Sequence, residues 1–340
     1  METMKKSTLT IFCILAGCIF FLSGIWIYFQ KNLDRVELGE GERATAYQRH
    51  YLMIANDKDT GMWQSVYESA SKEAESKDAY VELLSPEQMN GYSQADCLKI
   101  GIASKVDGII LEADGSKEEQ HLITEALKDG IPVVTVMTDD TATSRISFVG
   151  LNSYQMGSAY GEKVAEYVTK DTESILILLK KNIDDMNQSQ IYTQISNAAQ
   201  AKAGDSQSIQ VTGKNLLSTG IFETEEAVTD IFQQKDKVPD ILVCMDEDTT
   251  ECARQAVLDF NLAGKVTIIG YYSSDDILTA VEKGVISVTC DVDTEQLGRY
   301  SIEALTEYQK DGRTNSYYNV DINFLDREAV RAMRREVQPK

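Results

Sequence analysis

The chain has 340 residues, 43% of them hydrophobic, which is long enough to bury two domain cores. Its 54 acidic and 33 basic residues give a formal net charge of −21, and a surface this negative repels nucleic acid. With two histidines, no Gly-x-Ser-x-Gly elbow and no phosphate loop, the sequence offers no metal site, triad or nucleotide site. We therefore expect neither a DNA-binding protein nor an enzyme, and no cofactor or metal.

The amino-terminal segment is apolar and uncharged from Ser7 to Phe29. At about 1.5 Å per residue, a helix of this length crosses a bilayer core of about 30 Å. Lys5 and Lys6 precede it, which predicts that the amino end lies inside and the bulk of the chain outside the cytoplasm. Residues 1–29 are therefore predicted to attach the protein to the cell membrane.

Two interpretations of this attachment remain open. The sequence Leu-Ala-Gly-Cys that ends at Cys18 is typical of a bacterial lipoprotein signal peptide, in which Cys18 becomes the lipidated first residue. Residues 19–29 stay apolar after it, which favours an uncleaved signal anchor. Residues 30–47 are polar, contain Gly39 and Gly41, and are predicted to be a short stalk.

From residue 48 onward, apolar runs of strand length alternate with segments of helical spacing. This alternation predicts parallel sheets covered by helices, which bind ligands at the carboxyl ends of their strands. Strands are predicted at residues 51–55, 80–84, 106–111, 131–137, 146–150, 174–179, 208–213, 240–245, 266–269 and 285–288. Helices are predicted to begin near Gly61, Asp246, Ser273 and Leu297, and to cover residues 94–103, 118–128, 157–169, 187–203 and 223–234.

The cysteines beyond the amino-terminal segment are Cys97, Cys244, Cys252 and Cys290, and they lack the spacing of metal ligands. We expect them to be small buried apolar residues. A disulfide between Cys244 and Cys252 is conceivable across one strand-helix turn.

A family resemblance becomes specific between Pro239 and Gly298, where the chain reads PDILVCMDEDTTECARQAVLDFNLAGKVTIIGYYSSDDILTAVEKGVISVTCDVDTEQLG. This order resembles the second half of the type I periplasmic sugar-binding proteins, the ribose-binding-like substrate-binding proteins of ABC transporters. The resemblance implies two doubly wound α/β lobes with parallel sheets, joined by a three-stranded hinge, with a small ligand clamped between them. By the family plan, lobe 1 comprises residues 48–150 and 292–320, and lobe 2 comprises residues 151–291 and 321–335.

In that family, aromatic rings stack on the sugar while polar side chains bond its hydroxyls, because a sugar presents both kinds of surface. Most of the corresponding positions carry a different residue type in this chain, so the ligand is left open. Trp63 also shares a helix face with Val66 and Ala70, which makes a place in the core the alternative to ligand stacking. The family positions fall on Asp59, Thr60, Met62, Trp63, Met137, Thr138, Asp139, Tyr192, Met245, Asp246, Tyr272 and Val292.

Acidic residues recur at the predicted strand ends and crossings. Helix capping explains several of them. The sharper hypothesis is that an acidic cleft with aromatic rings, Trp63, Tyr192, Tyr271 and Tyr272, selects a cationic or amine-bearing small molecule. The acidic residues concerned are Asp59, Asp139, Asp140, Asp246, Asp275, Asp291 and Asp293.

These patterns together predict a membrane-tethered extracellular solute-binding protein that closes on a small ligand, a carbohydrate or an amine-bearing relative. The resemblance implies that the permease of an ABC importer recognises the closed form. The alternative partner is a membrane sensor kinase that receives the signal of ligand binding. The altered pocket and the uncleaved anchor favour the second partner without deciding between them.

Overall fold

The computed structural model describes residues 47–56, 60–86, 92–139, 142–180, 185–205, 207–216, 221–234 and 238–337. The segment expected to attach the protein to the membrane, including Cys18, lies outside these residues. Within the described part of the chain, no helix combines the length and the apolar character that crossing a membrane requires.

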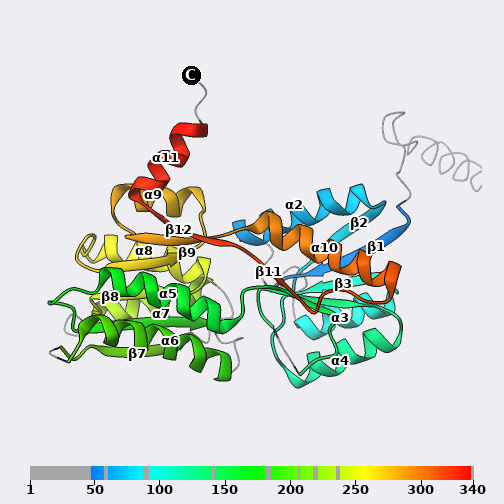
Figure 1. Ribbon diagram of the computed structural model, residues 1–340, viewed down its shortest axis with the longest axis horizontal. Coiled ribbons are helices and arrows are strands. Elements are labelled where there is room, and N and C mark those ends of the chain that lie inside the picture. Colours follow the sequence, from blue (N-terminus) through cyan, green and yellow to red (C-terminus); the bar gives the residue numbers. More distant parts are fainter. Residues whose placement is uncertain are drawn as a thin grey trace, which may run out of the picture. The chain divides into compact units, whose positions relative to one another are not determined.

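The described chain folds into two six-stranded sheets, each covered by helices (Figure 1), as the alternation of strands and helices predicted. We call the first sheet and its helices lobe 1. Its strand order is β11-β5-β4-β3-β1-β2, and all its strand pairs are parallel. Its strands are β1 (Arg49–Ile54), β2 (Ala79–Leu84), β3 (Gly108–Leu111), β4 (Val133–Val136), β5 (Ser147–Gly150) and β11 (Tyr317–Asn319). Its helices are α2 (Gly61–Ser76), α3 (Gln94–Ala103), α4 (Lys117–Lys128) and α10 (Thr294–Asp311).

Lobe 2 repeats this plan with the strand order β12-β10-β9-β8-β6-β7. It differs at one edge, because β12 runs antiparallel to β10. Its strands are β6 (Ser174–Lys180), β7 (Gln210–Leu216), β8 (Ile241–Cys244), β9 (Thr267–Tyr271), β10 (Val288–Val292) and β12 (Ile322–Asp326). Its helices are α5 (Ser153–Tyr167), α6 (Asp185–Ala203), α7 (Ile221–Gln233), α8 (Glu247–Asp259), α9 (Asp275–Lys283) and α11 (Arg327–Val337).

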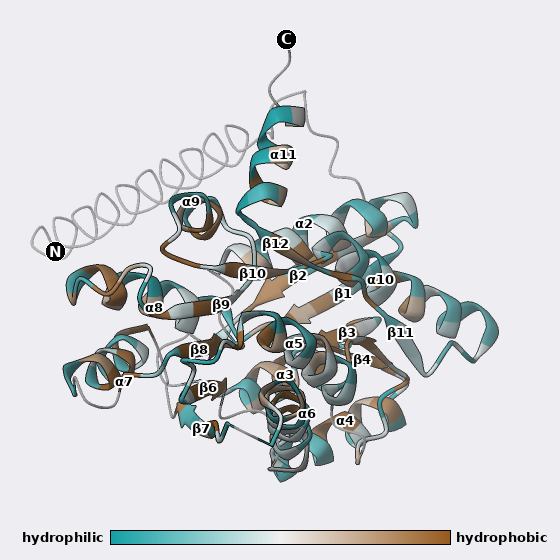
Figure 2. Ribbon diagram, turned by 60° about the vertical axis from the view of Figure 1, so that its left-hand side comes forward, coloured by the Kyte–Doolittle hydropathy of each residue, from teal (hydrophilic) through white to brown (hydrophobic). Residues whose placement is uncertain are grey.

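The central strands are buried along their whole length, as parallel strands covered on both faces must be. Every residue of β3, β4, β5 and β8 is buried. In Figure 2 the strands β1 and β2 are largely hydrophobic, whereas the covering helices alternate hydrophobic and hydrophilic residues. Hydrophobic burial on both sheet faces is therefore what holds each lobe together.

In each lobe the crossover helix packs closely on another helix: α10 on α2 in lobe 1, and α5 on α6 in lobe 2. Glycine makes both contacts possible. A Cβ on Gly298 of α10 would lie 2.5 Å from the Val66 carbonyl oxygen and 2.5 Å from the Ala70 nitrogen. A Cβ on Gly157 of α5 would lie 2.8 Å from the Ile191 Cα. Both distances are shorter than carbon normally tolerates, so the backbones could not approach this closely with a larger residue.

The chain crosses between the lobes after β5, after β10 and after β11. Backbone hydrogen bonds tie these crossings together. The Val320 N–H donates to the Gly150 carbonyl at 3.3 Å, and the Asp293 N–H donates to the Asp321 carbonyl at 3.1 Å. The three crossings therefore lie side by side as one hinge.

The strand predicted at residues 285–288 was placed too early, because β10 begins at Val288. Gly284 adopts the left-handed conformation at the end of α9. The N–H groups of Val285 and Ile286 both reach back to the Ala280 carbonyl. These residues complete the helix cap, so they are unavailable to the sheet.

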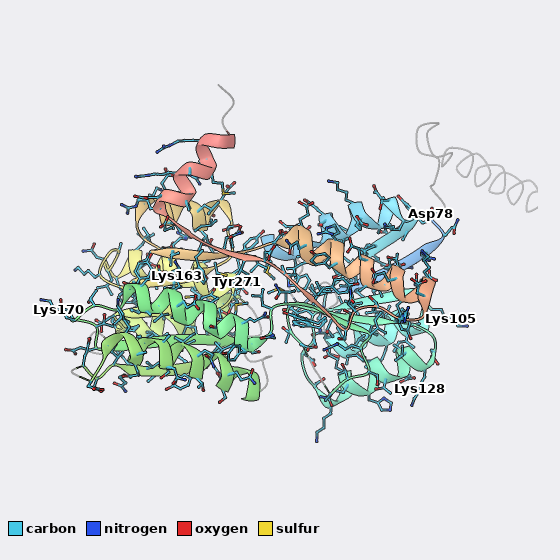
Figure 3. The ribbon with its side chains drawn as sticks, in the orientation of Figure 1. Asp78, Lys105, Lys128, Lys163, Lys170 and Tyr271 are labelled. Carbon is cyan, nitrogen blue, oxygen red and sulfur yellow. The ribbon has the colours of Figure 1, made fainter. Side chains whose placement is uncertain are left out.

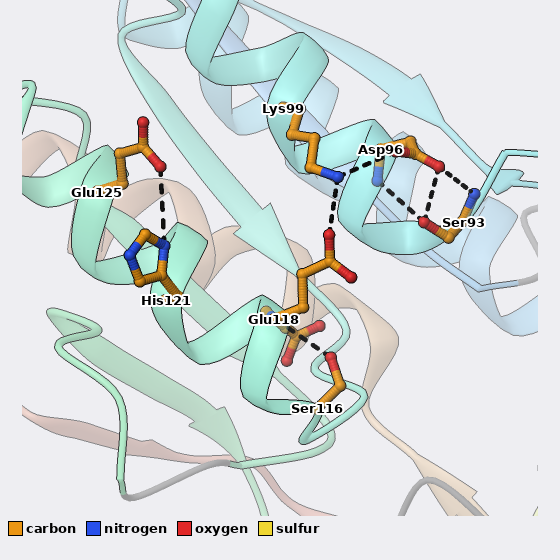
Figure 4. A network of polar contacts seen from close by, with 8 residues as sticks. Ser93, Asp96, Lys99, Ser116, Glu118, His121 and Glu125 are labelled. Atoms are coloured by element: carbon orange, nitrogen blue, oxygen red, sulfur yellow. Dashed lines mark hydrogen bonds and ion pairs between the residues drawn. The ribbon is translucent and has the colours of Figure 1, made fainter.

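The four described cysteines are free and buried, and the disulfide considered between Cys244 and Cys252 is not formed. His121 lies on the exposed side of α4 beside Glu125 (Figure 4). In the same view Lys99 of α3 bonds Glu118 of α4 at 2.8 Å, which ties these two neighbouring helices together.

Candidate functional site

The two lobes touch at the carboxyl ends of their sheets. The Met62 N–H at the start of α2 donates to Glu247 Oε2 at 3.3 Å, and the hydroxyls of Ser65 and Tyr272 lie 3.1 Å apart. Between these contacts lies Tyr271, at the end of β9 (Figure 3). We call this region the interlobe site and define it by Met62 and Met137 of lobe 1 with Glu247, Tyr271 and Tyr272 of lobe 2.

Tyr271 reaches from lobe 2 into lobe 1. Its side chain is 3% exposed, and its hydroxyl points to the Met62 sulfur at 3.6 Å and to the Met137 sulfur at 3.9 Å. A thioether sulfur is a weak hydrogen-bond acceptor, so the phenol is held mainly by packing. Burial raises the pKa of Tyr271 well above its usual value, which keeps the phenol neutral.

Left-handed backbone sets the direction of two neighbours of Tyr271. Met137 has φ 64° and Tyr272 has φ 72°, and each directly follows its strand, β4 or β9. The Met137 N–H donates to Val149 and the Tyr272 N–H to Cys290, so both conformations are fixed by the adjacent strand. This conformation costs a residue other than glycine about 1–2 kcal/mol. Backbone strain of this kind is typical of binding and catalytic sites.

Carboxylates line the ends of the strands around this point. Glu247, in the first turn of α8, accepts from lobe 1, and burial raises its pKa to about 7. Asp246 caps α8 by accepting from the Thr249 N–H at 2.9 Å. Glu112, directly after β3, is 4% exposed and accepts from the Asn56 N–H at 3.0 Å. The site is therefore acidic on both lobes.

Two further aspartates have protein partners. Asp139 accepts both the Nε and the Nη2 of Arg145, the latter at 2.8 Å, which is the fork geometry that suits a carboxylate. Asp291 accepts from the Ser273 hydroxyl, and burial raises its pKa. Asp293 caps α10 by accepting from the Gln296 N–H at 2.8 Å, so helix capping accounts for this residue as it does for Asp246.

The structure brings some of the residues selected from the sequence together. Met62, Met137 and Tyr272 belong to the interlobe site, and Asp246 adjoins it. Thr60 caps α2 and stands two residues before Met62. Thr138 and Met245 follow the ends of β4 and β8 and are half-buried.

Other selected residues lie elsewhere. Trp63 is 2% exposed and packs in the core with Val66 and Ala70, the place that its helix face allowed. Tyr192 donates to the Val211 carbonyl near the start of β7, which is the opposite end of the sheet from the interlobe site. Val292, the last residue of β10, is 2% exposed. Asp59 and Asp140 lie outside the described residues.

Sequence reasoning did not select Glu112 and Glu247 as site residues, and it named Tyr271 only among the aromatic rings of the acidic cleft. All three stand within three residues of a strand end in the structure, where parallel sheets bind ligands. The distance of a residue from a strand end therefore identified these site residues better than its residue type did.

Comparison with known proteins agrees with this architecture. A family model described as a periplasmic binding protein domain matches residues 51–314. A search of curated proteins gave no match.

Several solved structures share the fold. GanP, a glucose-galactose binding protein from Geobacillus stearothermophilus, is 20% identical with a TM-score of 0.71 over 82% of this chain and 98% of its own. An ABC transporter periplasmic solute binding protein from Actinobacillus succinogenes 130z, with bound D-allose, is 21% identical with a TM-score of 0.69 over 84% and 100%. A chain of the XylFII-LytSN complex is 20% identical with a TM-score of 0.68 over 83% and 98%.

Proposed function

Because this chain belongs to the periplasmic binding protein family, whose members among its matches are sugar-binding proteins and not enzymes, we propose that it binds a small sugar-like ligand between its lobes. We place the protein outside the cytoplasm, tethered by residues 1–29, and assign the ligand to the interlobe site. The observation that carries this proposal is Tyr271, which spans from lobe 2 to two methionines of lobe 1 at the carboxyl ends of the sheets.

Closure is the mechanism that this contact supports. Glu247 holds the amino end of α2, and Tyr272 meets Ser65, so groups from both lobes already interact. A ligand that adds contacts to both lobes binds the closed form more tightly than the open form and shifts the population toward it. The permease of an ABC importer would then recognise the closed protein and take up the ligand.

A second candidate is a ligand sensor that signals to a membrane sensor kinase. One observation favours it: a neighbour in fold was solved as the XylFII-LytSN complex. In this version the binding protein changes a partner's activity and does not deliver its ligand.

The test is a thermal-shift screen of the full-length chain in mild detergent against sugars, amino sugars, polyamines and nucleosides. A ligand at one hundred times its dissociation constant stabilises the folded chain by about 2.7 kcal/mol and raises the melting temperature. We expect a hit whose shift is lost in Tyr271→Ala.

The matched control is Tyr154→Ala, a tyrosine of α5 that is 58% exposed, which should keep the shift. If no compound in any class raises the melting temperature, the chain is not a small-molecule binding protein of this family type. Genes for a permease beside this one would support the importer, and a gene for a sensor kinase would support the sensor.

A further inference from the structure

The charged side chains around the Tyr271 hydroxyl are carboxylates. Three carboxylates act on its hydroxyl: Glu112 from lobe 1, and Asp246 and Glu247 from lobe 2. Glu112 directly follows β3, Asp246 is the second residue after the equivalent strand β8, and Glu247 follows Asp246. Negative charge from both lobes therefore converges on one nearly dry point, where electrostatic interactions are stronger than in water.

One of these carboxylates has an unused acceptor. Asp246 is 6% exposed, and its Oδ2 is buried with no hydrogen-bond partner among the described residues. The hydroxyls closest along the chain are engaged elsewhere: Thr249 and Thr250 donate to the Asp246 backbone carbonyl at 3.1 and 2.7 Å, not to its carboxylate. A buried charged oxygen without a donor destabilises a protein, so a donor from outside the chain would offset this cost.

Four cationic side chains of the described chain do not supply that donor. Arg145, in lobe 1, is committed to Asp139 through both nitrogens of its fork. Lys105, Lys128 and Lys170 precede β3, β4 and β6, so they stand at the amino ends of the strands, and Figure 3 shows them away from Tyr271. The charge at the interlobe site is thus not balanced by these groups.

We propose that the interlobe site selects a protonated amine, whose N–H group donates to Asp246 Oδ2 while Glu112 and Glu247 balance its charge. This inference rests on the proposed function and names the ligand class of the same site. A hydroxyl could satisfy the unused oxygen, but it would leave two buried carboxylates and the half-buried Glu247 without a counter-charge. A quaternary ammonium would supply the charge but no donor, so primary and secondary amines fit best.

Tyr271 is the group that has to move. Its hydroxyl is held by two thioether sulfurs, both weak acceptors, so displacing it breaks no strong hydrogen bond. Its ring, together with that of Tyr272, can then lie against the ligand, since aromatic faces attract cations.

The test compares matched ligand pairs by isothermal titration calorimetry on the full-length chain. Glucosamine is paired with glucose, and putrescine with butane-1,4-diol, so that each pair differs in charge at nearly constant size. We expect at least one amine to bind at least tenfold more tightly than its neutral partner. Tetramethylammonium should bind more weakly than the best primary amine.

Two variants test whether the amine binds at these carboxylates. Asp246→Asn keeps the helix cap, because asparagine caps as well as aspartate, and should lower amine affinity at least tenfold. Glu247→Gln should also lower amine affinity. It serves as the test if Asp246→Asn does not fold. Glu118→Gln, an exposed carboxylate of α4 that is paired with Lys99, is the control and should leave affinity unchanged.

The outcomes separate the two proposals. If glucose or another neutral sugar binds more tightly than its amine, and Asp246→Asn leaves amine affinity unchanged, the amine inference is wrong while the solute-binding function stands. If none of the probes and none of the compounds in the thermal-shift screen binds, both are wrong.

Discussion

The two lobes are built on the same frame and carry different chemistry. In each, the crossover helix begins at a capping side chain, Asn152 or Asp293, that accepts from the N–H of a glutamine three residues later. In each, a glycine lies five residues after the cap and faces a neighbouring helix: Gly157 faces α6, and Gly298 faces α2. The two lobes therefore share their strand order and also individual helix caps and helix-helix contacts.

The two lobes differ in the side chains at the carboxyl ends of their strands. Met137 and Tyr272 occupy equivalent places with the same left-handed backbone, yet one presents a thioether and the other a phenol. At this interface lobe 1 supplies two sulfur atoms, a backbone N–H and the Ser65 hydroxyl, and lobe 2 supplies two phenol hydroxyls and the Glu247 carboxylate. A duplicated frame can thus change its ligand by changing a few side chains on one lobe, without altering the fold.

The largest effect should come from two buried carboxylates on the equivalent helices α4 and α8. Glu119 of α4 is fully buried, accepts from the N–H groups of Asp114 and Gly115, and burial raises its pKa to about 8. Between pH 4.5 and 8 the folded chain keeps a proton that the unfolded chain has lost. This contribution to stability is complete below pH 4.5 and disappears as the pH rises through 8, by on the order of 2–5 kcal/mol.

Denaturant unfolding across this pH range checks the prediction, with Glu119→Gln as the variant that should lose the dependence. Glu118→Gln, its exposed neighbour, is the control and should retain it. Glu247→Gln should remove a smaller dependence that ends near pH 7. Identical pH profiles for the wild type and Glu119→Gln would show that Glu119 is ionised in the folded chain.

A smaller effect should appear at the two helix contacts. Gly298→Ala and Gly157→Ala should each lower the free energy of unfolding by about 1–3 kcal/mol, because the added methyl forces the helices apart. Gly298→Ala should cost more, since its Cβ would meet two backbone atoms at 2.5 Å. Gly213→Ala is the control, because its Cβ would lie 3.6 Å or more from its neighbours. Equal values for all three would contradict the close packing.

The smallest effect should come from one bond between the lobes. Tyr272→Phe removes the hydroxyl that meets Ser65 and should cost about 0.5–1.5 kcal/mol, together with a larger radius of gyration by small-angle X-ray scattering. Tyr318→Phe removes a bond to Glu307 within lobe 1, so it should affect stability without opening the lobes. An unchanged radius in Tyr272→Phe would mean that this bond does not hold the lobes together.

The sequence was most informative where local rules decide the structure. Buried apolar runs located the central strands, and the helix predicted to begin near Asp246 is α8, which Asp246 caps. Local rules also explain the error at β10, since the residues after Gly284 satisfy a helix cap before they join a strand. The sequence defines which residues share a face but not what that face meets. For this reason Trp63 was open between core and site, Tyr192 was assigned to the site but bonds the Val211 carbonyl, and the insertion of Tyr271 between two distant methionines was not foreseen.

The number of crossings has a mechanical consequence. From β1 to α11 the chain changes lobe three times, after β5, β10 and β11, so the two ends of this path belong to different lobes. A pulling force applied between Arg49 and α11 would therefore act across the hinge and the interlobe contacts as well as on the two sheets. With an even number of crossings both attachment points would lie on one lobe, and the same force would leave the other lobe slack. The odd number makes the opening of this protein sensitive to tension along its own chain.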